Sequence, residues 1–380
     1  MTRILIAVTA DISVRLLTGQ LDYLAKRGFD VHLVVSRGEN SEALKRNGTI
    51  TVHQVDMARD ISLKQDISAL FQMIRVFRKV RPDISNVGTP KAGLLGSIAA
   101  FLTRTKQRIY TLRGLRIETE TGFKRTILKW MEQLTMRLAT HIIAISPSLV
   151  TACEELGLKG TNKMTVLGEG SSNGLDIALF EEKRQETVPA PFPNDHFVIG
   201  FTGRITKDKG VEELLEAFGT FSEMNLLLVG GLDEHHGLKP ETVDLIQRHP
   251  RIHMTGFIAN PAPFYNFMDV FVIPSYREGF SNVCLEAAAA ELAVIGTNVT
   301  GIKDAVVDGQ TGLLVEPYSS VAIQSAITTF WREENLRKVY ALNGKNRVLE
   351  HFQSEQIWAE MAAFYEKGEG NHVWLREARN

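Results

Sequence analysis

Two glutamates stand on either side of a glycine-containing turn in the second half of the chain. Glu278 lies in the turn, and Glu286 follows it in an alanine-rich segment that we expect to be helical from about Asn282. The amino terminus of a helix offers unpaired N–H groups and the positive end of the helix dipole, which suit a phosphate. Glu286, on the first turn of this helix, is placed to accept hydrogen bonds from a ribose, and Glu278 to reach a sugar. A favourable interaction with the helix dipole alone is the alternative explanation for Glu286.

A second pattern combines glycine with cations directly after an apolar segment. A predicted strand ends at Gly203, Arg204 follows it, and Lys209 precedes Gly210 and a helix expected from about Val211. Glycine lets the backbone approach a ligand closely, and two cations at the end of a strand suit a diphosphate. A basic surface turn without a ligand is the alternative.

The third candidate is the turn Thr255–Ile258, which follows another predicted strand. Such a turn exposes backbone groups that can meet the edge of a nucleotide base, and Phe257 is placed to pack nearby. Taken alone, this segment is equally an ordinary junction between a strand and a loop.

For the three candidate segments to form one site, the helices and strands around them must bring them together. Short apolar segments alternate with amphipathic ones in two series, separated by a proline-rich stretch at 189–193. This alternation is typical of βαβ units on a parallel sheet. The fold class is therefore predicted to be α/β, with two Rossmann-like domains facing across a cleft that holds the ligands. We expect strands at 4–9, 31–35, 51–55, 84–87, 108–111, 141–145, 197–203, 225–229, 252–255, 270–273 and 292–297.

Length and charge support two domains with different partners. A chain of 380 residues fits two domains of about 150–200 residues each. We expect an N-terminal domain over 1–165, a C-terminal domain over 166–355, and a last segment, 356–380, that crosses back to the first domain. Residues 1–165 carry 25 Lys and Arg against 14 Asp and Glu, whereas the rest carries 18 against 30. A basic first half favours an anionic partner there, with meaningless surface charge as the alternative.

Several classes of protein are disfavoured. The first predicted strand is not followed by the Gly-x-Gly-x-x-Gly of dinucleotide-dependent oxidoreductases, and the stretch 88–96 lacks the Gly-Lys-Ser/Thr of a P-loop. We expect no nucleic-acid partner. Only two cysteines are present, and the amino terminus leads directly into an apolar strand, so we expect a cytoplasmic protein in a reducing compartment.

In their order and spacing, these motifs resemble those of glycosyltransferase family 4, the retaining enzymes of the GT-B fold. The resemblance extends over essentially the whole chain. The matching segments are Gly203-Arg204 with Lys209-Gly210, Gly256-Phe257, Glu278-x7-Glu286, and Asp308-Gly309-x-Thr311-Gly312-Leu313-Leu314-Val315.

The resemblance assigns roles to the donor residues of a sugar transfer. It implies that Arg204 and Lys209 hold the diphosphate of a UDP-sugar and take part in catalysis with Glu278, which lies beside the donor sugar. It further implies that Glu286 holds the ribose and that the turn 256–258 contacts the base. The predicted donor-binding residues are Gly203, Arg204, Lys209, Gly256, Phe257, Ile258, Ser281, Asn282, Val283 and Glu286.

The first half resembles a narrower group, the bacterial capsule, O-antigen and N-glycan assembly transferases. Those enzymes add N-acetylhexosamines to sugars linked to undecaprenyl diphosphate, which implies a lipid-linked saccharide as acceptor and an N-acetylhexosamine such as GalNAc as the transferred sugar. Two departures affect this likeness: Arg113-Gly114 stands where many members have His-Gly, and the loop 11–19 lacks paired glycines. The candidate acceptor-binding residues are Lys91, Arg113 and Arg116. The matching segments are Gly88–Gly96, Tyr110–Arg116 and Ser171–Asp176.

The expected chemistry needs no metal or other cofactor. The sequence has no Asp-x-Asp pair, and His235-His236 lack acidic or cysteine partners. The two donor cations and a helix dipole would then stabilise the leaving group, and the sugar would be transferred from the front face with retention. A nucleotide-sugar 2-epimerase of the same fold and a non-catalytic sugar-binding module are the alternatives.

A last expectation concerns the membrane. The segment Arg104–Arg137 is rich in cations, and Phe123–Met131 mixes them with large apolar residues. Basic amphipathic helices of this kind can lie on an anionic membrane surface, here the inner face of the cytoplasmic membrane. The alternative is that Ile127, Trp130, Met131 and Leu134 simply face the core of their own domain.

Overall fold

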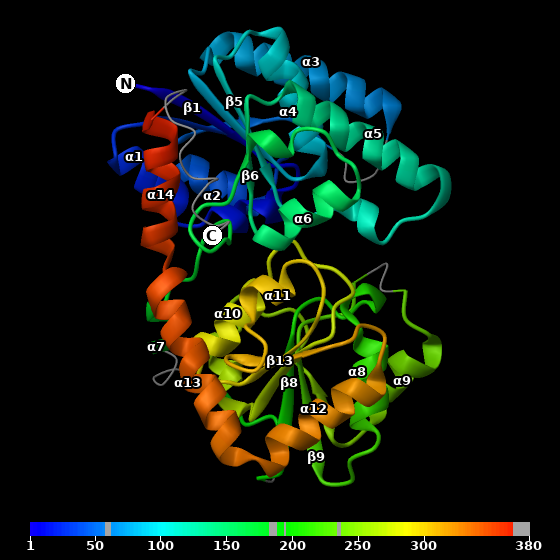
Figure 1. The fold of residues 1–380 in the computed structure, drawn as a ribbon. Coiled ribbons are helices and arrows are strands. Elements are labelled where there is room, and N and C mark those ends of the chain that lie inside the picture. Colours follow the sequence, from blue (N-terminus) through cyan, green and yellow to red (C-terminus); the bar gives the residue numbers. More distant parts are fainter. Residues whose placement is uncertain (58–61, 182–187, 194, 234–236, 368–380) are drawn as a thin grey trace. The chain divides into compact units, whose positions relative to one another are not determined.

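The structure is a computed structural model that describes residues 1–57, 62–181, 188–193, 195–233 and 237–367. The chain divides into two compact units (Figure 1). The first unit contains Met1–Gly174 together with the segment that begins at Ser354, and the second unit contains Leu175–Gln353. The proline-rich stretch 189–193, which we expected to separate the two series of strands, falls within the second unit.

A sheet of seven parallel strands forms the centre of the first unit, in the order β3-β2-β1-β4-β5-β6-β7. Its central strands are buried on both faces, which explains their continuous apolar runs, such as Ile4–Val8. β7 was not predicted because two residues are too short for a recognisable pattern. The strands are β1 (Arg3–Ala7), β2 (Asp30–Val35), β3 (Thr51–Gln54), β4 (Ile84–Gly88), β5 (Gln107–Leu112), β6 (His141–Ala144) and β7 (Met164–Thr165).

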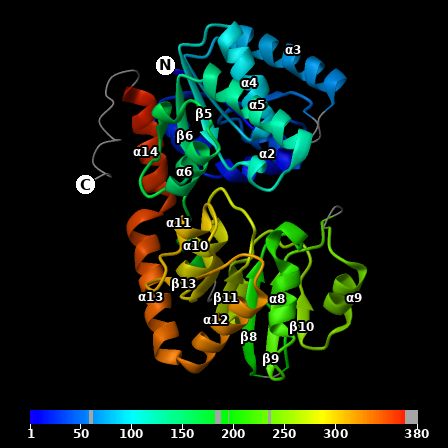
Figure 2. The same ribbon diagram turned by 45° about the vertical axis from the view of Figure 1, so that its right-hand side comes forward.

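Helices cover both faces of this sheet. Right-handed crossovers place α1 and α2 on one face and α3, α4 and α5 on the other, because the chain moves outward from β1 to β3 and then back across to β6. Figures 1 and 2 show α3, α4 and α5 side by side. α14 packs against α1 and adds three side chains to the core. The helices are η1 (Asp11–Leu17), α1 (Gln20–Lys26), α2 (Glu39–Asn47), α3 (Leu63–Val80), α4 (Pro90–Leu102), η2 (Arg116–Glu118), α5 (Gly122–Leu138), α6 (Pro147–Glu155), η3 (Thr161–Lys163) and α14 (Ser354–Lys367).

The second unit repeats this architecture with a sheet of six parallel strands in the order β10-β9-β8-β11-β12-β13. Every strand predicted for the two units is present, within two residues at each end, and β13 is an additional one. The strands are β8 (Phe197–Thr202), β9 (Met224–Val229), β10 (Ile252–Met254), β11 (Val270–Ile273), β12 (Val294–Thr297) and β13 (Gly312–Val315). The helices are α7 (Ala178–Glu181), η5 (Lys207–Lys209), α8 (Val211–Phe218), α9 (Pro240–Arg248), η6 (Ala262–Phe267), α10 (Asn282–Ala289), α11 (Ile302–Ala305), α12 (Ser320–Arg332) and α13 (Glu334–His351).

Both units therefore have the predicted α/β class with parallel, Rossmann-like sheets. In such sheets the loops at the carboxyl ends of the strands hold the ligands, so that edge of each sheet is where the candidate residues must lie. Among the described helices, none is both long and apolar enough to cross a membrane.

Candidate functional site

The carboxyl edge of the second sheet brings the donor candidates together. β8 and β11 are parallel neighbours, so the turn after β8 and the loop after β11 emerge at the same edge. The amide of Tyr276 donates a hydrogen bond to the carbonyl of Asp208 at 3.0 Å, which fixes the loop to η5. Gly210 permits this approach: it has φ +68°, and a Cβ there would lie 2.0 Å from the carbonyl oxygen of Pro274.

Lys209 and Glu278 form an ion pair at this edge. The Nζ of Lys209 donates to Oε1 of Glu278, and both side chains are largely buried. The backbone of Glu278 is also held, because its amide donates to the carbonyl of Thr300 at 3.3 Å. The predicted catalytic glutamate and one predicted diphosphate-binding cation are thus in direct contact.

Arg204, the other predicted diphosphate-binding cation, is much more accessible. Its side chain is 64% exposed, and Nη1 pairs with Oδ2 of Asp233 at 3.0 Å. Exposed ion pairs contribute only about 0–1 kcal/mol, so a diphosphate can replace this partner at little cost. Asp233 was not among the sequence candidates because it follows β9 and belongs to none of the recognised motifs.

Glu286 lies one residue beyond the first turn of α10, which corrects our expectation that it lies on that turn. The helix dipole weakens beyond the first turn, so a direct side-chain contact defines its environment better. The hydroxyl of Tyr265 donates to Oε2 of Glu286 at 2.8 Å. Burial raises the pKa of Glu286 to about 7, and this hydrogen bond opposes the shift. Tyr265 was missed because no local pattern links two residues that are separated by 21 positions.

The remaining donor candidates surround these groups on the same edge. Ser281 is the N-cap of α10, but its side chain does not cap the helix; its hydroxyl instead accepts a hydrogen bond from the thiol of Cys284. Asn282 and Val283, the first two residues of α10, are partly exposed.

The turn 256–258 follows β10, whose parallel neighbour is β9. Gly256 has φ +74°, and Phe257 is 70% exposed rather than packed into the core. The hydroxyl of Thr255 accepts a hydrogen bond from the amide of Gly230 at 3.2 Å, which holds this turn next to the end of β9. The assigned contact with a base stays a prediction.

In the first unit, Arg113 has an unusual environment at the carboxyl end of β5. Its Nε and Nη1 are buried and have no hydrogen-bond partner among the described residues. Burial lowers the pKa of Arg113 to about 10. The side chain lies over Gly88 at the end of β4, where a Cβ would come within 2.9 Å of Nε. A buried cation with unpaired donors is costly unless an anion completes it.

Lys91 lies near Arg113 in the fold, as the second residue of α4 after β4. Its Nζ pairs with Asp66 of α3 at 2.6 Å, and its side chain is largely buried. Arg116, in η2, is exposed. The structure therefore brings Lys91 and Arg113 to one edge of the sheet, whereas Arg116 lies farther along the chain after β5.

The start of α4 carries a strained residue that the sequence did not indicate. Thr89, its N-cap, has φ +67°, a region that residues with a Cβ rarely adopt. Its hydroxyl contacts the hydroxyl of Thr9 at 2.8 Å, and Thr9 in turn accepts from the amide of Ala92 at 3.0 Å. Thr9, which follows β1, thus provides the capping contact that Thr89 does not. Strain of this kind is concentrated at functional sites, which agrees with the position of Lys91 and Arg113.

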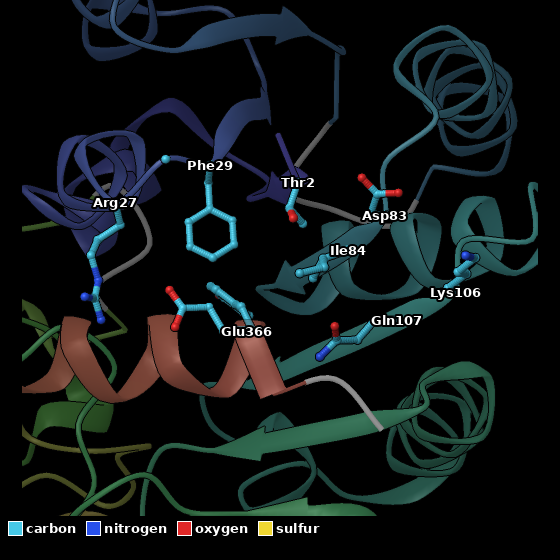
Figure 3. Close-up of a pocket in the computed structure, with 10 residues that line it drawn as sticks. Thr2, Arg27, Phe29, Asp83, Ile84, Lys106, Gln107 and Glu366 are labelled. Carbon is cyan, nitrogen blue, oxygen red and sulfur yellow. The ribbon is translucent and has the colours of Figure 1, made fainter. Parts of the chain in front are cut away.

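A cavity of about 700 Å³ opens at the other edge of the first sheet (Figure 3). Thr2, Ile84 and Gln107 at the amino ends of β1, β4 and β5 line it, together with Glu366 of α14. None of the predicted site residues borders this cavity. Because ligands of parallel sheets bind at the carboxyl ends of the strands, the cavity lies at the wrong edge for the predicted chemistry.

Among the described residues, no group of three His, Cys, Asp or Glu side chains is arranged to hold a metal ion. The pair His235-His236 lies outside the described residues.

The chain is similar to known protein families and proteins. Residues 4–146 match the family described as glycosyl transferase 4-like, and residues 196–333 match glycosyl transferases group 1. The chain is 43% identical over 364 residues to the capsular polysaccharide biosynthesis glycosyltransferase CapM of Staphylococcus aureus, with 94% of this chain and 95% of CapM covered. The chain belongs to glycosyltransferase family 4.

More distant proteins are similar to the chain over most of its length. The N,N'-diacetylbacillosaminyl-diphospho-undecaprenol alpha-1,3-N-acetylgalactosaminyltransferase of Campylobacter jejuni is 24% identical over 342 residues, covering 86% of this chain and 89% of that enzyme. HepE of Anabaena, solved in complex with UDP and glucose, has a TM-score of 0.80 at 20% identity, covering 97% and 100% of the two chains. The predicted GT-B fold class is thus confirmed, and the chain is a glycosyltransferase.

The contact between Tyr265 and Glu286 generates a prediction for this family 4 glycosyltransferase. Tyr265→Phe removes the hydrogen bond that keeps the pKa of Glu286 from rising further, so more of the carboxyl is protonated at pH 7. Only the ionised carboxylate accepts two hydrogen bonds from a ribose. We expect the Kd for a nucleoside diphosphate to increase about tenfold or more at pH 7, since hydrogen bonds to charged groups contribute about 1.5–3 kcal/mol.

The pH dependence separates this effect from general damage. Binding to the unmodified protein should weaken as the pH falls through about 7, the pKa of Glu286, and the Tyr265→Phe variant should recover part of its affinity at higher pH. Calorimetry across this range measures both effects. Tyr340→Phe, at a half-buried tyrosine in α13, is the matched control. Equal affinities of the Tyr265→Phe variant and the unmodified protein at every pH would contradict the positioning role.

Proposed function

We propose that this protein is a retaining glycosyltransferase that moves a sugar from a UDP-sugar to a lipid-diphosphate-linked saccharide during bacterial surface polysaccharide assembly. The observation that carries the proposal is the gathering of Arg204, Lys209, Glu278 and Glu286 at one edge of the second sheet. Two cations suit a diphosphate, and two carboxylates suit the hydroxyl groups of the sugars on either side of it.

The charges of the site suit the departure of a nucleoside diphosphate. As the bond between the anomeric carbon and the diphosphate breaks, negative charge grows on the diphosphate oxygen. Arg204 can leave Asp233 to meet this charge, while the more deeply placed Lys209 supplies a second cation. The acceptor hydroxyl attacks from the face that the leaving group departs from, and its proton passes to the diphosphate. This accounts for retention and uses no metal.

The acceptor half of the proposal rests on the first unit. Arg113 offers buried N–H donors without partners, and Lys91 lies at the start of a helix on the same edge. This arrangement suits the diphosphate of a lipid-linked acceptor. The Campylobacter relative acts on a diphospho-undecaprenol acceptor and transfers N-acetylgalactosamine, and CapM belongs to capsule synthesis. GalNAc is therefore our first choice for the sugar, capsule assembly for the pathway, and the inner face of the cytoplasmic membrane for the location.

The direct test is transfer itself. We expect the protein to move a sugar from one of a panel of UDP-sugars to an undecaprenyl-diphosphate-linked saccharide, with the α configuration of the donor retained in the product. Activity should persist in EDTA, because Arg204 and Lys209 take the role that a divalent cation has in other transferases. Mass spectrometry and NMR of the product measure both points. Complete loss of transfer in EDTA, restored by magnesium or manganese, would disprove the metal-independent mechanism. Conversion of the UDP-sugar to its 2-epimer would show that the protein is an epimerase and not a transferase.

Replacing either of the two predicted donor cations should reduce turnover, but only one replacement should reduce stability. Arg204→Ala and Lys209→Ala should each lower turnover by about 100-fold or more, because both remove charge that the transition state needs. Lys209→Ala should also lower the free energy of unfolding by about 1–3 kcal/mol, since it leaves Glu278 unpaired in a largely buried place. Arg204→Ala should leave stability nearly unchanged.

Two matched variants control this comparison. Lys207→Ala removes an exposed cation from the same η5 turn and should change neither turnover nor stability. Asp233→Asn releases Arg204 from its ion pair and should keep or improve affinity for the donor. Near-normal turnover of both the Arg204→Ala and Lys209→Ala variants would show that the donor assignment is wrong.

Arg113 provides a separate test of the acceptor site. Arg113→Gln should raise the KM for the lipid-diphosphate acceptor by about tenfold or more, because it removes a charge-assisted contact, and should leave the KM for the donor unchanged. Arg113→Lys, which keeps the charge, should retain more of the activity. A Kd for inorganic diphosphate that is the same in the unmodified protein and the Arg113→Gln variant would remove Arg113 from the acceptor site.

A further inference from the structure

The helices α3 and α5 of the first unit expose large apolar side chains in their N-terminal halves. On α3, Leu63, Ile67 and Phe71 are 78%, 54% and 69% exposed, and on α5, Phe123 and Trp130 are 80% and 65% exposed. Single exposed apolar residues are ordinary on protein surfaces, but several large ones near one place indicate an interaction site. We call these five residues the apolar edge surface.

α3 carries more large apolar side chains than its packing in the domain accounts for. Its core side is formed by Ala69, Met73 and Phe77, which are buried and recur every four residues. Leu63, Ile67 and Phe71 recur with the same period and therefore form a second apolar stripe along the helix. Only the first stripe is covered by the domain.

The exposure of α5 contradicts one part of the expectation that its apolar residues face the core. The alternative that Trp130 faces the core is wrong, because this side chain is largely exposed. Ile127, Met131 and Leu134 are only partly buried. The first buried residue of α5 is Thr135, in its last turns. The N-terminal half of this helix is therefore mostly exposed, with Ile127 and Leu128 partly buried.

The topology of the sheet places the N-terminal halves of the two helices on either side of the start of α4, at one edge of the sheet. α3, α4 and α5 lie on the same face, and α3 and α5 each pack against α4 (Figures 1 and 2). Each helix begins after the carboxyl end of a strand, so their N-terminal halves all lie near that edge of the sheet. The ion pair between Lys91 and Asp66 joins the start of α4 to the first turn of α3. The apolar edge surface therefore lies next to the edge that holds Lys91 and Arg113.

The charges around this surface are mostly positive. The first ten residues of α5 contain Lys124, Arg125 and Lys129 and no acid, although Lys124 pairs with Glu120 just before the helix. α3 adds the exposed Lys64, while its Asp66 is already paired with Lys91. A second copy of the chain would bring like charges together across a symmetric interface. An anionic lipid surface instead complements the cations and accepts the apolar side chains among its acyl chains.

We propose that the apolar edge surface docks on an anionic lipid bilayer and that α3 inserts side chains into it together with α5. The cations of α5 and Lys64 then face the lipid headgroups. The edge that carries Lys91 and Arg113 lies at the depth of those headgroups, which is where the diphosphate of a membrane-bound acceptor is found. This inference deepens the proposed function and relies on it only for the nature of that acceptor.

The test is flotation of the full chain with vesicles of phosphatidylcholine alone and of phosphatidylcholine mixed equally with phosphatidylglycerol. We expect binding to the anionic vesicles that weakens as salt is raised. The double variants Ile67→Ser with Phe71→Ser, on α3, and Phe123→Ser with Trp130→Ser, on α5, should each weaken this binding about tenfold or more. Leu102→Ser is the matched control: Leu102 is 57% exposed but ends α4, at the opposite edge of the sheet.

The controls keep this inference separate from the proposed function. All variants should melt like the unmodified protein and should transfer sugar to a water-soluble, short-chain acceptor at an unchanged rate, because they leave the donor and acceptor residues intact. Vesicle binding without any transfer would refute the proposed function and leave the docking surface standing. Unchanged binding of the α3 double variant would overturn the docking proposal. So would a dimer of the unmodified protein, seen by light scattering, that fails to bind vesicles and dissociates in the double variants.

Discussion

Parallel strands all end at the same edge of their sheet, and every candidate residue of this protein depends on that constraint. In the second unit, segments that are far apart in the sequence meet only because β8, β9, β10 and β11 present their carboxyl ends together. The constraint leaves little freedom to the backbone: Gly210 is needed where η5 passes within contact of Pro274. The chemistry of the site is therefore a property of the sheet as much as of the individual side chains.

Electrostatics divides the candidate donor residues into a fixed ion pair and an exchangeable one. Lys209 and Glu278 are paired in a largely buried place, where separating them would be costly, so this contact fixes the positions of both side chains. Arg204 and Asp233 pair in solvent, where the pair contributes little. A ligand with two phosphates thus meets one cation that is already positioned and another that can move to it. Glu286, with its raised pKa, adds a group whose charge depends on pH near neutrality.

The sequence predicted the fold class and the strands, and indicated the candidate donor motifs, because these features are local. Alternation of apolar and amphipathic segments identifies parallel strands, and the two cations and two glutamates lie in short patterns around glycine. The contacts that tune the site could not be predicted in this way. Tyr265, Asp233 and the Thr9–Thr89 pair reach their partners only through the folded sheet. The exposure of Trp130 could not be predicted either, because apolar residues at helical spacing look the same in the sequence whether they face a core or the solvent.

The return of the chain to the first unit has a consequence for biosynthesis. Met361, Ala362 and Tyr365 of α14 belong to the core cluster that surrounds β1 and α1, and the hydroxyl of Tyr365 accepts a hydrogen bond from the side chain of Asn86. On the ribosome, the whole continuous second unit, Leu175–Gln353, emerges before these residues do. The first unit therefore cannot complete its core until α14 has been synthesised, after the whole second unit. Until then, the apolar side chains that α14 covers stay exposed. A chain that stops before α14 would leave uncovered the apolar side chains of the first unit that Met361, Ala362 and Tyr365 pack against.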